Sequence, residues 1–171
     1  MSTVQQDASA PDSGASTSKN LRIALAGNPN CGKTTVFNGY TGARQHVGNY
    51  PGVTVERKEG DVVVGDTRVT LVDLPGTYSL TAYSMEEIVA RRELSSNNIQ
   101  AVIDVAEASA LERNLLLTVQ MLEMGMPVVL GCNMMDEAKA GGITIDMPRL
   151  SQALGIPVFP MTARSGDGLK E

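Results

Sequence analysis

The residues with the clearest potential for chemistry lie in one loop, 27–34, whose sequence is GNPNCGKT. The loop matches the pattern G-x-x-x-x-G-K-[ST] without a mismatch, a spacing typical of loops that bind a nucleoside polyphosphate. Its glycines let the backbone bend around phosphates, while successive N–H groups and a helix N-terminus supply partial positive charge. Lys33 adds a full charge for the β and γ phosphates, and the Thr34 hydroxyl is a ligand for Mg²⁺. An ordinary glycine-rich turn is the alternative, and the motifs that follow argue against it.

Two further segments bear on the phosphates. Asp73 and Gly76 form the pattern D-x-x-G, which places a carboxylate where it holds Mg²⁺ through water and an amide where it senses the γ phosphate. Between the two motifs lies a turn-rich segment, 49–54, whose last residue, Thr54, is expected to ligate the metal only in the triphosphate state. The sequence therefore predicts a switch as well as a binding loop.

A third group of residues is predicted to bind the base of the nucleotide. Asn133 and Asp136 form N-x-x-D after a buried strand, and the Asp136 carboxylate can accept hydrogen bonds from the N1–H and the 2-amino group of guanine. A backbone amide in the segment 162–164, that of Ala163, is expected to donate to guanine O6. The motifs together predict a guanine nucleotide. The usual Lys of N-K-x-D is replaced by Met134, which leaves an ATPase or a promiscuous NTPase open.

These motifs need elements that bring them together, and the sequence alternates between strand-like and helix-like segments. Apolar runs predict strands at 21–26, 56–64, 67–74, 101–104, 128–133 and 158–160, with helices expected at 33–41, 84–94, 109–122 and 147–154. The pair Gly65-Asp66 reads as a two-residue hairpin turn, so one strand is antiparallel. We expect an α/β fold with a mostly parallel six-stranded sheet, one antiparallel strand and helices on both faces.

Capping residues mark the helix starts. Ser84 with Glu87, and Ser109 with Glu112, have the spacing of capping boxes. Asp146 can cap the helix that begins at 147. The helix that follows Ser109 is expected to bury one face, formed by Leu111, Leu115, Val119 and Leu122.

Composition limits the class of protein. The chain has 171 residues, 42% of them apolar, which suits a single domain with one core. Its net charge of −5 and the lack of a basic stripe argue against a nucleic-acid partner. Residues 1–20 are polar and low in complexity, which predicts a disordered leader before a domain at 21–171. No run of about 18 apolar residues is present, so we expect a soluble chain.

The sequence also resembles a known family. The motif order resembles that of the translation-factor-related, Ras-like GTPases, which implies the Ras-like P-loop GTPase fold. Three stretches resemble the G domain of FeoB-type bacterial ferrous iron transporters: GNPNCGKTTVFNGYTGARQHVGNYPGVTVERKEGD, VDLPGTYSLTAYSMEEIVARREL and NMMDEAKAGGITID. The resemblance covers 21–171. It implies a Mg²⁺-dependent GTPase that controls iron uptake at the cytoplasmic face of the inner membrane. In that family a helical guanine-dissociation-inhibitor domain and a polytopic membrane domain follow, so the chain looks truncated before them; small accessory proteins and a homo-oligomer are further expected partners.

The resemblance further implies how hydrolysis is assisted. In the family an Asn of the phosphate loop helps a bound K⁺ supply positive charge, and the matching residue is Asn30, for which a turn residue is the alternative. Backbone carbonyls matching Gly48 and Tyr50 complete that cation site. Thr77 stands where Ras-type enzymes have the Gln that orients water, so intrinsic hydrolysis is expected to be slow. A nucleotide-gated switch with negligible turnover therefore stays open.

The residues of the expected site form three groups. The catalytic residues are Asn30, Lys33, Thr54 and Gly76. The nucleotide-binding residues are Gly27, Asn28, Pro29, Asn30, Cys31, Gly32, Lys33, Thr34, Thr35, Asn133, Met134, Asp136, Thr162, Ala163 and Arg164. The metal ligands are Thr34, Thr54 and, through water, Asp73 for Mg²⁺, with Asn30, Gly48 and Tyr50 for K⁺. Cys31 is either a serine-like turn residue or, beside Lys33 at a helix N-terminus, a stabilised thiolate open to oxidation.

Overall fold

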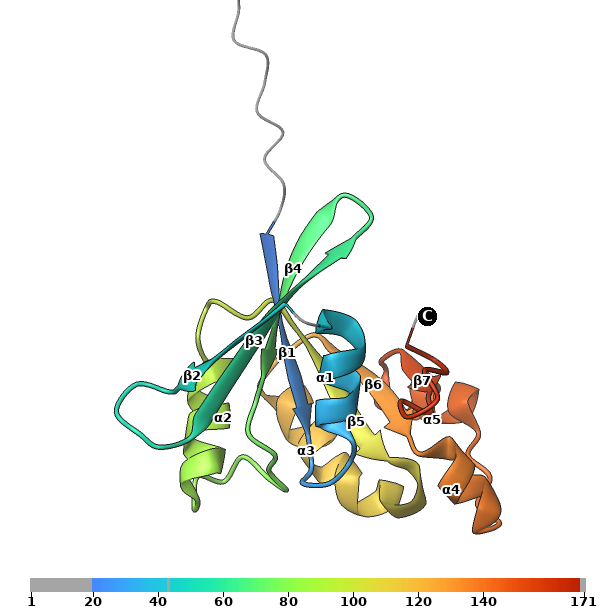
Figure 1. Ribbon diagram of the computed structural model, residues 1–171. Helices are drawn as coiled ribbons and strands as arrows, with labels where there is room; N and C mark the ends of the chain where they lie inside the picture. The colour runs from blue at the N-terminus through green and yellow to red at the C-terminus, as the bar shows by residue number, and fades with distance from the viewer. Residues whose placement is uncertain (1–19, 43, 170–171) are drawn as a thin grey trace, which may run out of the picture.

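The computed structural model describes residues 20–42 and 44–169, which form one sheet with helices on both faces (Figure 1). The strand order is β2-β3-β4-β1-β5-β6-β7. The strands are β1 (Asn20–Gly27), β2 (Gln45–Asn49), β3 (Glu56–Val64), β4 (Thr67–Asp73), β5 (Ala101–Glu107), β6 (Val128–Asn133) and β7 (Val158–Pro160). The expected leader lies outside the described residues except for Asn20, which already belongs to β1.

Only β3 runs against the other strands, because it pairs antiparallel with both of its neighbours. The remaining pairs are parallel, which confirms the mostly parallel α/β sheet with one antiparallel strand. The sheet has seven strands rather than the six expected, because the polar segment Gln45–Asn49 adds β2 at its edge. This segment lacks apolar alternation, so only its backbone pairing with β3 makes it a strand.

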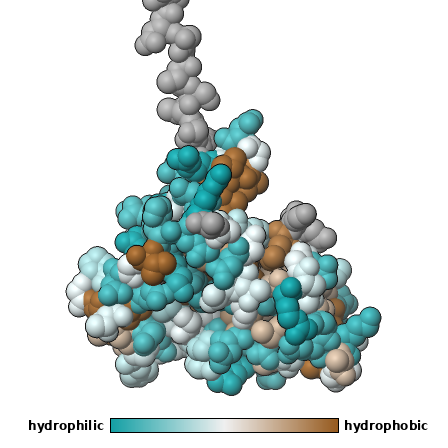
Figure 2. Space-filling model, viewed as in Figure 1, coloured by the Kyte–Doolittle hydropathy of each residue, from teal (hydrophilic) through white to brown (hydrophobic). Residues whose placement is uncertain are grey.

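The β3–β4 hairpin turns at Gly65 and Asp66, as predicted, with Val64 opposite Thr67. Gly65 has a φ of 58°, the left-handed conformation that such two-residue turns require. Polar side chains dominate the face of the molecule in Figure 2, and apolar ones gather at this hairpin tip, where Val63 and Val64 are exposed.

The helices are α1 (Lys33–Thr41), α2 (Met85–Leu94), α3 (Leu111–Glu123), α4 (Met135–Ala140) and α5 (Met147–Leu154), with a 3₁₀ turn, η1 (Ala108–Ala110), before α3. Helix α1 packs Val36 and Phe37 against one face of the sheet. On the other face, α2 and α3 bury Leu94, Leu117 and Met121 with residues of β1, β5 and β6. None of the helices in the described part of the chain combines the length and the apolar character needed to cross a bilayer.

Two of the three predicted helix caps are confirmed. The Ser84 hydroxyl accepts a hydrogen bond from the Glu87 amide, and the Asp146 carboxylate accepts one from the Arg149 amide at 3.0 Å. The cap at Ser109 is wrong, because that hydroxyl donates to the Glu107 carboxylate and η1 intervenes before α3 begins.

Helix α3 packs on the sheet with a face that overlaps the predicted one in part. Its buried residues are Asn114, Leu117, Thr118 and Met121, whereas Val119 is exposed. Leu111, Leu115 and Leu122 pack at the margin of the core. The polar pair Asn114 and Thr118 is buried because each has a partner: Asn114 binds backbone groups of Glu107 and Ala110, and Thr118 binds a carboxylate of the sheet.

That carboxylate belongs to Asp104, which is 1% exposed in the middle of β5. The Thr118 hydroxyl donates to it at 2.6 Å. Burial raises the pKa of Asp104 to about 6, from an ordinary value of 3.8, and the bond from Thr118 offsets only part of that rise. The folded domain therefore holds this proton more tightly than the unfolded chain does.

Between pH 3.8 and about 6 the folded state binds the extra proton, so the Asp104 contribution to stability is lost as the pH rises through that window. Asp104→Asn removes the charge and keeps the acceptor for Thr118. We expect its free energy of unfolding to exceed that of the wild type by up to about 3 kcal/mol at about pH 8. Urea unfolding of both proteins across this range tests the expectation, and a difference that does not shrink on acidification contradicts it.

Candidate guanine-nucleotide site

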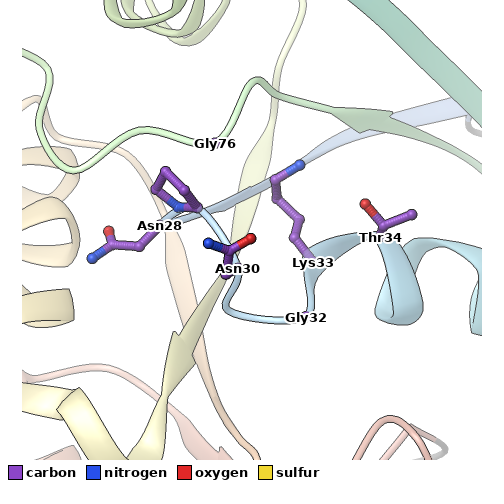
Figure 3. A pocket seen from close by; sticks show the side chains of 7 residues that line it. Asn28, Asn30, Gly32, Lys33, Thr34 and Gly76 are labelled. Atoms are coloured by element: carbon purple, nitrogen blue, oxygen red, sulfur yellow. The ribbon is translucent and has the colours of Figure 1, made fainter.

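The phosphate loop joins β1 to α1 at the carboxyl end of the sheet and encloses a hollow of about 490 Å³ (Figure 3). The hollow is lined by Asn28, Pro29, Asn30, Gly32, Lys33, Thr34 and Gly76. Gly32 has a φ of 86°, and a Cβ there would overlap the amide of Asn133. Only glycine fits at this point, because the loop lies directly against Asn133.

The central contact of the hollow is an ion pair between Lys33 and Asp73. The Lys33 ammonium lies 2.5 Å from a carboxylate oxygen of Asp73, and the two side chains are 11% and 9% exposed. Residues from two separate motifs thus meet because β4 lies beside β1 in the parallel sheet. The Thr34 hydroxyl, on the first turn of α1, and the Asp73 carboxylate are hard oxygen donors of the kind that Mg²⁺ takes, so these residues fit the metal.

The D-x-x-G segment rests directly on the phosphate loop. The Thr77 amide donates to the Gly27 carbonyl at 3.2 Å, and a Cβ on Gly76 would come within 3.3 Å of Pro29. Gly76 therefore lines the phosphate hollow beside Pro29, and the contact of its amide with the γ phosphate stays a prediction. Thr77 is buried, and Tyr78 stacks under the Arg113 guanidinium at 4.3 Å. Neither side chain replaces the water-orienting Gln of Ras-type enzymes.

The first switch is not assembled at this hollow. Gly48 lies in β2 opposite Arg57, and Thr54 is exposed in the loop between β2 and β3. Tyr50 begins that loop with its side chain buried. None of the three lines the phosphate hollow, so their expected metal contacts require this segment to move.

A second hollow, of about 230 Å³, adjoins the first through Gly32. It is lined by Gly32, Thr35, Asn133, Met134, Asp136, Glu137, Thr162, Ala163 and Arg164. Every base residue predicted from the sequence is present, and Glu137 is an addition that the N-x-x-D motif does not mark. The predicted phosphate and base residues therefore converge on two adjoining hollows, apart from the first switch and from Gly27 and Cys31, which are buried and line neither hollow.

Asn133 links the two hollows. Its buried amide donates to the Cys31 carbonyl at 2.9 Å and accepts from the Ala163 amide at 2.9 Å. Asn133 thus ties the phosphate loop to the last loop of the domain. The Ala163 amide is engaged with this oxygen, so its donation to guanine O6 stays a prediction that requires a change of partner.

The carboxylate of Asp136, which is expected to bind the base, also has a partner. Arg164 donates to the Asp136 carboxylate at 2.8 Å, and the two side chains are 79% and 40% exposed. A guanidinium offers paired N–H donors, as the N1–H and 2-amino group of guanine do. Met134 has a φ of 60° and lies above Gly32, where the Lys of N-K-x-D would otherwise place its stem.

Cys31 is fully buried behind the loop. Burial raises the pKa of its thiol to about 11, although Lys33 acts in the opposite direction. The stabilised thiolate considered from the sequence is therefore wrong, and Cys31 is a buried turn residue.

The parallel sheet, the phosphate loop after its first strand and the adjoining base hollow define a G domain of the P-loop GTPase class. A sequence model of the family described as "Ferrous iron transport protein B" matches residues 21–171. The chain belongs to this FeoB family, of which it forms the N-terminal G domain. The resemblance inferred from the motifs is confirmed.

Relatives agree with this assignment. The Fe(2+) transport protein A/Fe(2+) transporter FeoB fusion protein of Porphyromonas gingivalis is 53% identical over 152 residues, which cover 88% of this chain and 18% of that protein. The Fe(2+) transporter FeoB of Salmonella typhimurium is 51% identical over 156 residues, or 89% of this chain and 20% of that protein. The chain thus spans about a fifth of the length of these curated relatives.

Solved structures give the same fold. The G domain of the T. maritima FeoB iron transporter is 43% identical with a TM-score of 0.84, covering 89% of this chain and 93% of that one. The cytosolic domain of L. pneumophila FeoB is 44% identical with a TM-score of 0.83, covering 87% and 65%. The cytosolic domain of T. maritima FeoB has also been solved in a GDP form; it is 44% identical with a TM-score of 0.84, covering 89% and 60%.

Asp136→Asn tests the assignment of the base hollow. An Asn amide cannot accept from both the N1–H and the 2-amino group, so GDP affinity should fall by about 100-fold or more. The same amide can donate to the 2-oxo group of xanthine, so XDP should bind the variant more tightly than GDP does. Titration with fluorescent GDP and XDP measures both affinities. Equal GDP binding by variant and wild type would show that Asp136 does not read the base.

Proposed function

We propose that this domain binds and hydrolyses GTP in a Mg²⁺-dependent, K⁺-activated reaction, and that its GTP and GDP states control ferrous iron uptake by the parent protein. The observation that carries the proposal is the meeting of Lys33, Asp73 and Gly76 beside a base hollow that presents Asp136. The GDP form of the T. maritima relative supports a guanine ligand.

Nucleotide binding is an exchange of partners at Lys33. When phosphates enter the hollow, the Lys33 ammonium turns from Asp73 to the β and γ oxygens, and the Asp73 carboxylate becomes available to metal-bound water. Mg²⁺, when bound, would neutralise charge on the phosphates; the Thr34 hydroxyl would hold it directly, and Thr54 would join once the first switch closes. The Gly76 amide then donates to the γ phosphate, which makes the D-x-x-G segment sensitive to hydrolysis.

Asn30 is the residue of this chain that supports potassium activation. It has a φ of 65°, is exposed, and directs its amide into the phosphate hollow in Figure 3. An amide oxygen there fits a monovalent cation, whose chemical contribution is positive charge near the leaving and transferred phosphates. Gly48 and Tyr50 would add their carbonyls after the first switch closes. Because Thr77 and Tyr78 do not orient water, slow intrinsic turnover is part of the proposal.

The link to iron rests on the family and on the relatives, which are named as Fe(2+) transporters. We infer that the parent protein carries a helical guanine-dissociation-inhibitor domain and an iron-conducting membrane domain, with this domain on the cytoplasmic face. Small accessory proteins and a second copy of the domain are proposed as further partners. Nucleic acid is not a proposed partner, because the chain is acidic.

Two other functions have specific support. Met134 in place of the common Lys favours a promiscuous NTPase that accepts ATP as well as GTP. The lack of a water-orienting residue after D-x-x-G favours a nucleotide-gated switch with negligible turnover. Each of these functions predicts a rate of GTP or ATP hydrolysis that differs from the main proposal.

Phosphate release from GTP and from ATP, with Mg²⁺ and either K⁺ or Na⁺, separates these functions. We expect faster GTP turnover in K⁺ and little ATP turnover. Asn30→Gly, which tolerates the positive φ and removes the amide, should reduce the K⁺ rate by about 10-fold or more. Equal, negligible rates in both salts would indicate the passive switch, and comparable ATP turnover would indicate the promiscuous NTPase.

Thr54→Ala tests the switch itself. Thr54 is exposed and away from the hollow here, so GDP affinity should stay within about two-fold of the wild type. Hydrolysis should slow by about 10-fold or more, because the triphosphate state loses a metal ligand. Single-turnover hydrolysis and GDP titration measure the two quantities. Unchanged hydrolysis would exclude Thr54 from the metal site.

A further inference from the structure

Tyr50 is a buried residue within a segment that is otherwise open to solvent. Its side chain is 5% exposed, while Asn49, Pro51, Gly52 and Thr54 are exposed. Burying an aromatic ring contributes substantially to holding a chain segment in place. Within 49–54 Tyr50 is the one buried residue, so its side chain ties this segment to the body of the domain.

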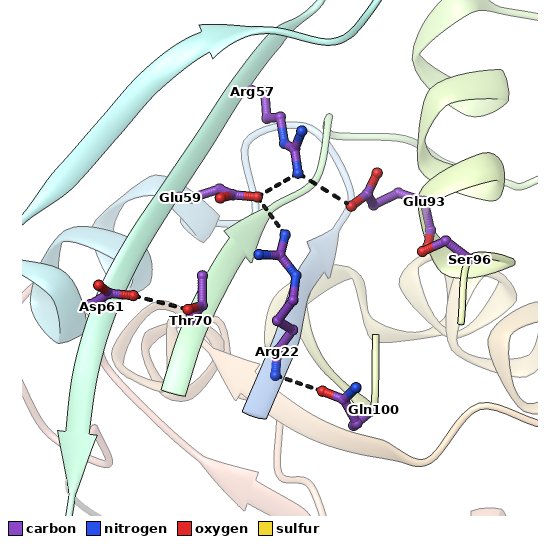
Figure 4. Close-up of polar contacts among 8 residues, drawn as sticks. All are labelled: Arg22, Arg57, Glu59, Asp61, Thr70, Glu93, Ser96 and Gln100. Carbon is purple, nitrogen blue, oxygen red and sulfur yellow. Dashed lines mark hydrogen bonds and ion pairs between the residues drawn. The ribbon is translucent and has the colours of Figure 1, made fainter. Parts of the chain in front are cut away.

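Arg57 holds the ring on one side. Its guanidinium lies 5.5 Å from the centre of the Tyr50 ring, a distance typical of a cation–π contact. The same guanidinium lies 2.6 Å from Glu59 on β3 and 3.8 Å from Glu93 on α2 (Figure 4). Arg22 of β1 also donates to Glu59, so the guanidinium over Tyr50 is fixed from three elements.

The ring rather than the hydroxyl makes the attachment. The Tyr50 hydroxyl is buried and has no hydrogen-bond partner among the described residues. Burial, and then the nearby Glu93 carboxylate, raise the pKa of the phenol, so it stays neutral. The contact therefore depends on packing and on Arg57.

The backbone of Tyr50 is engaged in this conformation. Its amide donates to the Val55 carbonyl at 2.9 Å, and its own carbonyl accepts from the Val53 amide at 3.2 Å. That carbonyl is the one expected to ligate K⁺ in the closed switch. In this conformation it closes a turn with Val53, and Tyr50 does not line the phosphate hollow with Asn30. We therefore expect this turn to open when the switch closes.

We propose that the Tyr50 side chain is a latch that holds the first switch in its open position. Arg57 and Glu93 are the positioning residues that keep the Tyr50 ring in its site. The inference rests on the proposed function, because it concerns the same GTP-dependent closure. Closing the switch withdraws the ring from its site, so the latch disfavours the GTP state and leaves the GDP state unaffected. Glu93 lies on the helix that follows D-x-x-G, so the latch also connects the two switches.

Tyr50→Ala tests the latch without altering the backbone carbonyl. We measure dissociation constants for GDP and for a non-hydrolysable GTP analogue, with Mg²⁺ and K⁺. The variant should tighten analogue binding relative to GDP by on the order of 10-fold, the factor expected from losing one buried side chain. Tyr83→Ala is the matched control, because that side chain is 93% exposed. Tyr50→Phe keeps the ring and should restore the wild-type ratio within about two-fold.

Glu93→Gln tests the positioning residues. Loss of this carboxylate loosens Arg57, and the analogue-to-GDP affinity ratio should rise by about two- to five-fold, as for a partly exposed ion pair. Glu86→Gln, at an exposed position of the same helix, should leave the ratio unchanged. If Glu93→Gln and Glu86→Gln have the same analogue-to-GDP affinity ratio, Glu93 is not a positioning residue.

The chain contains no tryptophan, so Tyr50→Trp provides a single reporter. Its emission should be that of a buried indole with GDP and should shift to longer wavelength with the analogue. Two results together would show that the latch proposal is wrong: the analogue binds without changing the emission, and Tyr50→Ala leaves the analogue-to-GDP affinity ratio unaltered. The assignment of nucleotide binding would still hold. If the analogue fails to bind the wild type, the proposed function itself fails.

Discussion

The ion pair between Lys33 and Asp73 is the contact on which the rest of the site depends. Both groups are largely removed from water, so each needs a partner of opposite charge. A ligand that takes Lys33 must therefore bring a cation for Asp73, which explains why phosphate and divalent metal are expected to enter together. The parallel pairing of β1 with β4 makes the contact possible, because it brings the ends of both strands to one edge of the sheet.

Asn133 extends this arrangement to the base. By joining the Cys31 carbonyl to the Ala163 amide, one buried side chain ties the loop that binds phosphates to the loop that surrounds the base. Removing either bond would leave a buried polar group without a partner, which is costly. The phosphate and base hollows are thus joined by one buried polar side chain.

Much of this was readable from the sequence. The loop at 27–34 and the hairpin at Gly65 follow from local chemistry, since glycines and a lysine at fixed spacing have few other uses. Strand β2 was not predictable, because its polar residues pair through the backbone alone. Three of the four residues predicted on the apolar face of α3 pack against the core. The burial of Asn114 and Thr118 was not predictable, because these side chains find polar partners inside the fold. The contact between Tyr50 and Arg57 depends on how the strands are arranged, which spacing along the chain does not show.

Strand β2 lies at the edge of the sheet, and one side of its backbone faces no other strand of the described residues. A strand in this position can detach without opening the interior, because the core clusters contain none of its residues. The domain can therefore narrow from seven strands to six while its core stays intact. The edge strand and the core are thus separate in their packing, so substitutions in β2 would act on the proposed first switch and leave the core contacts in place.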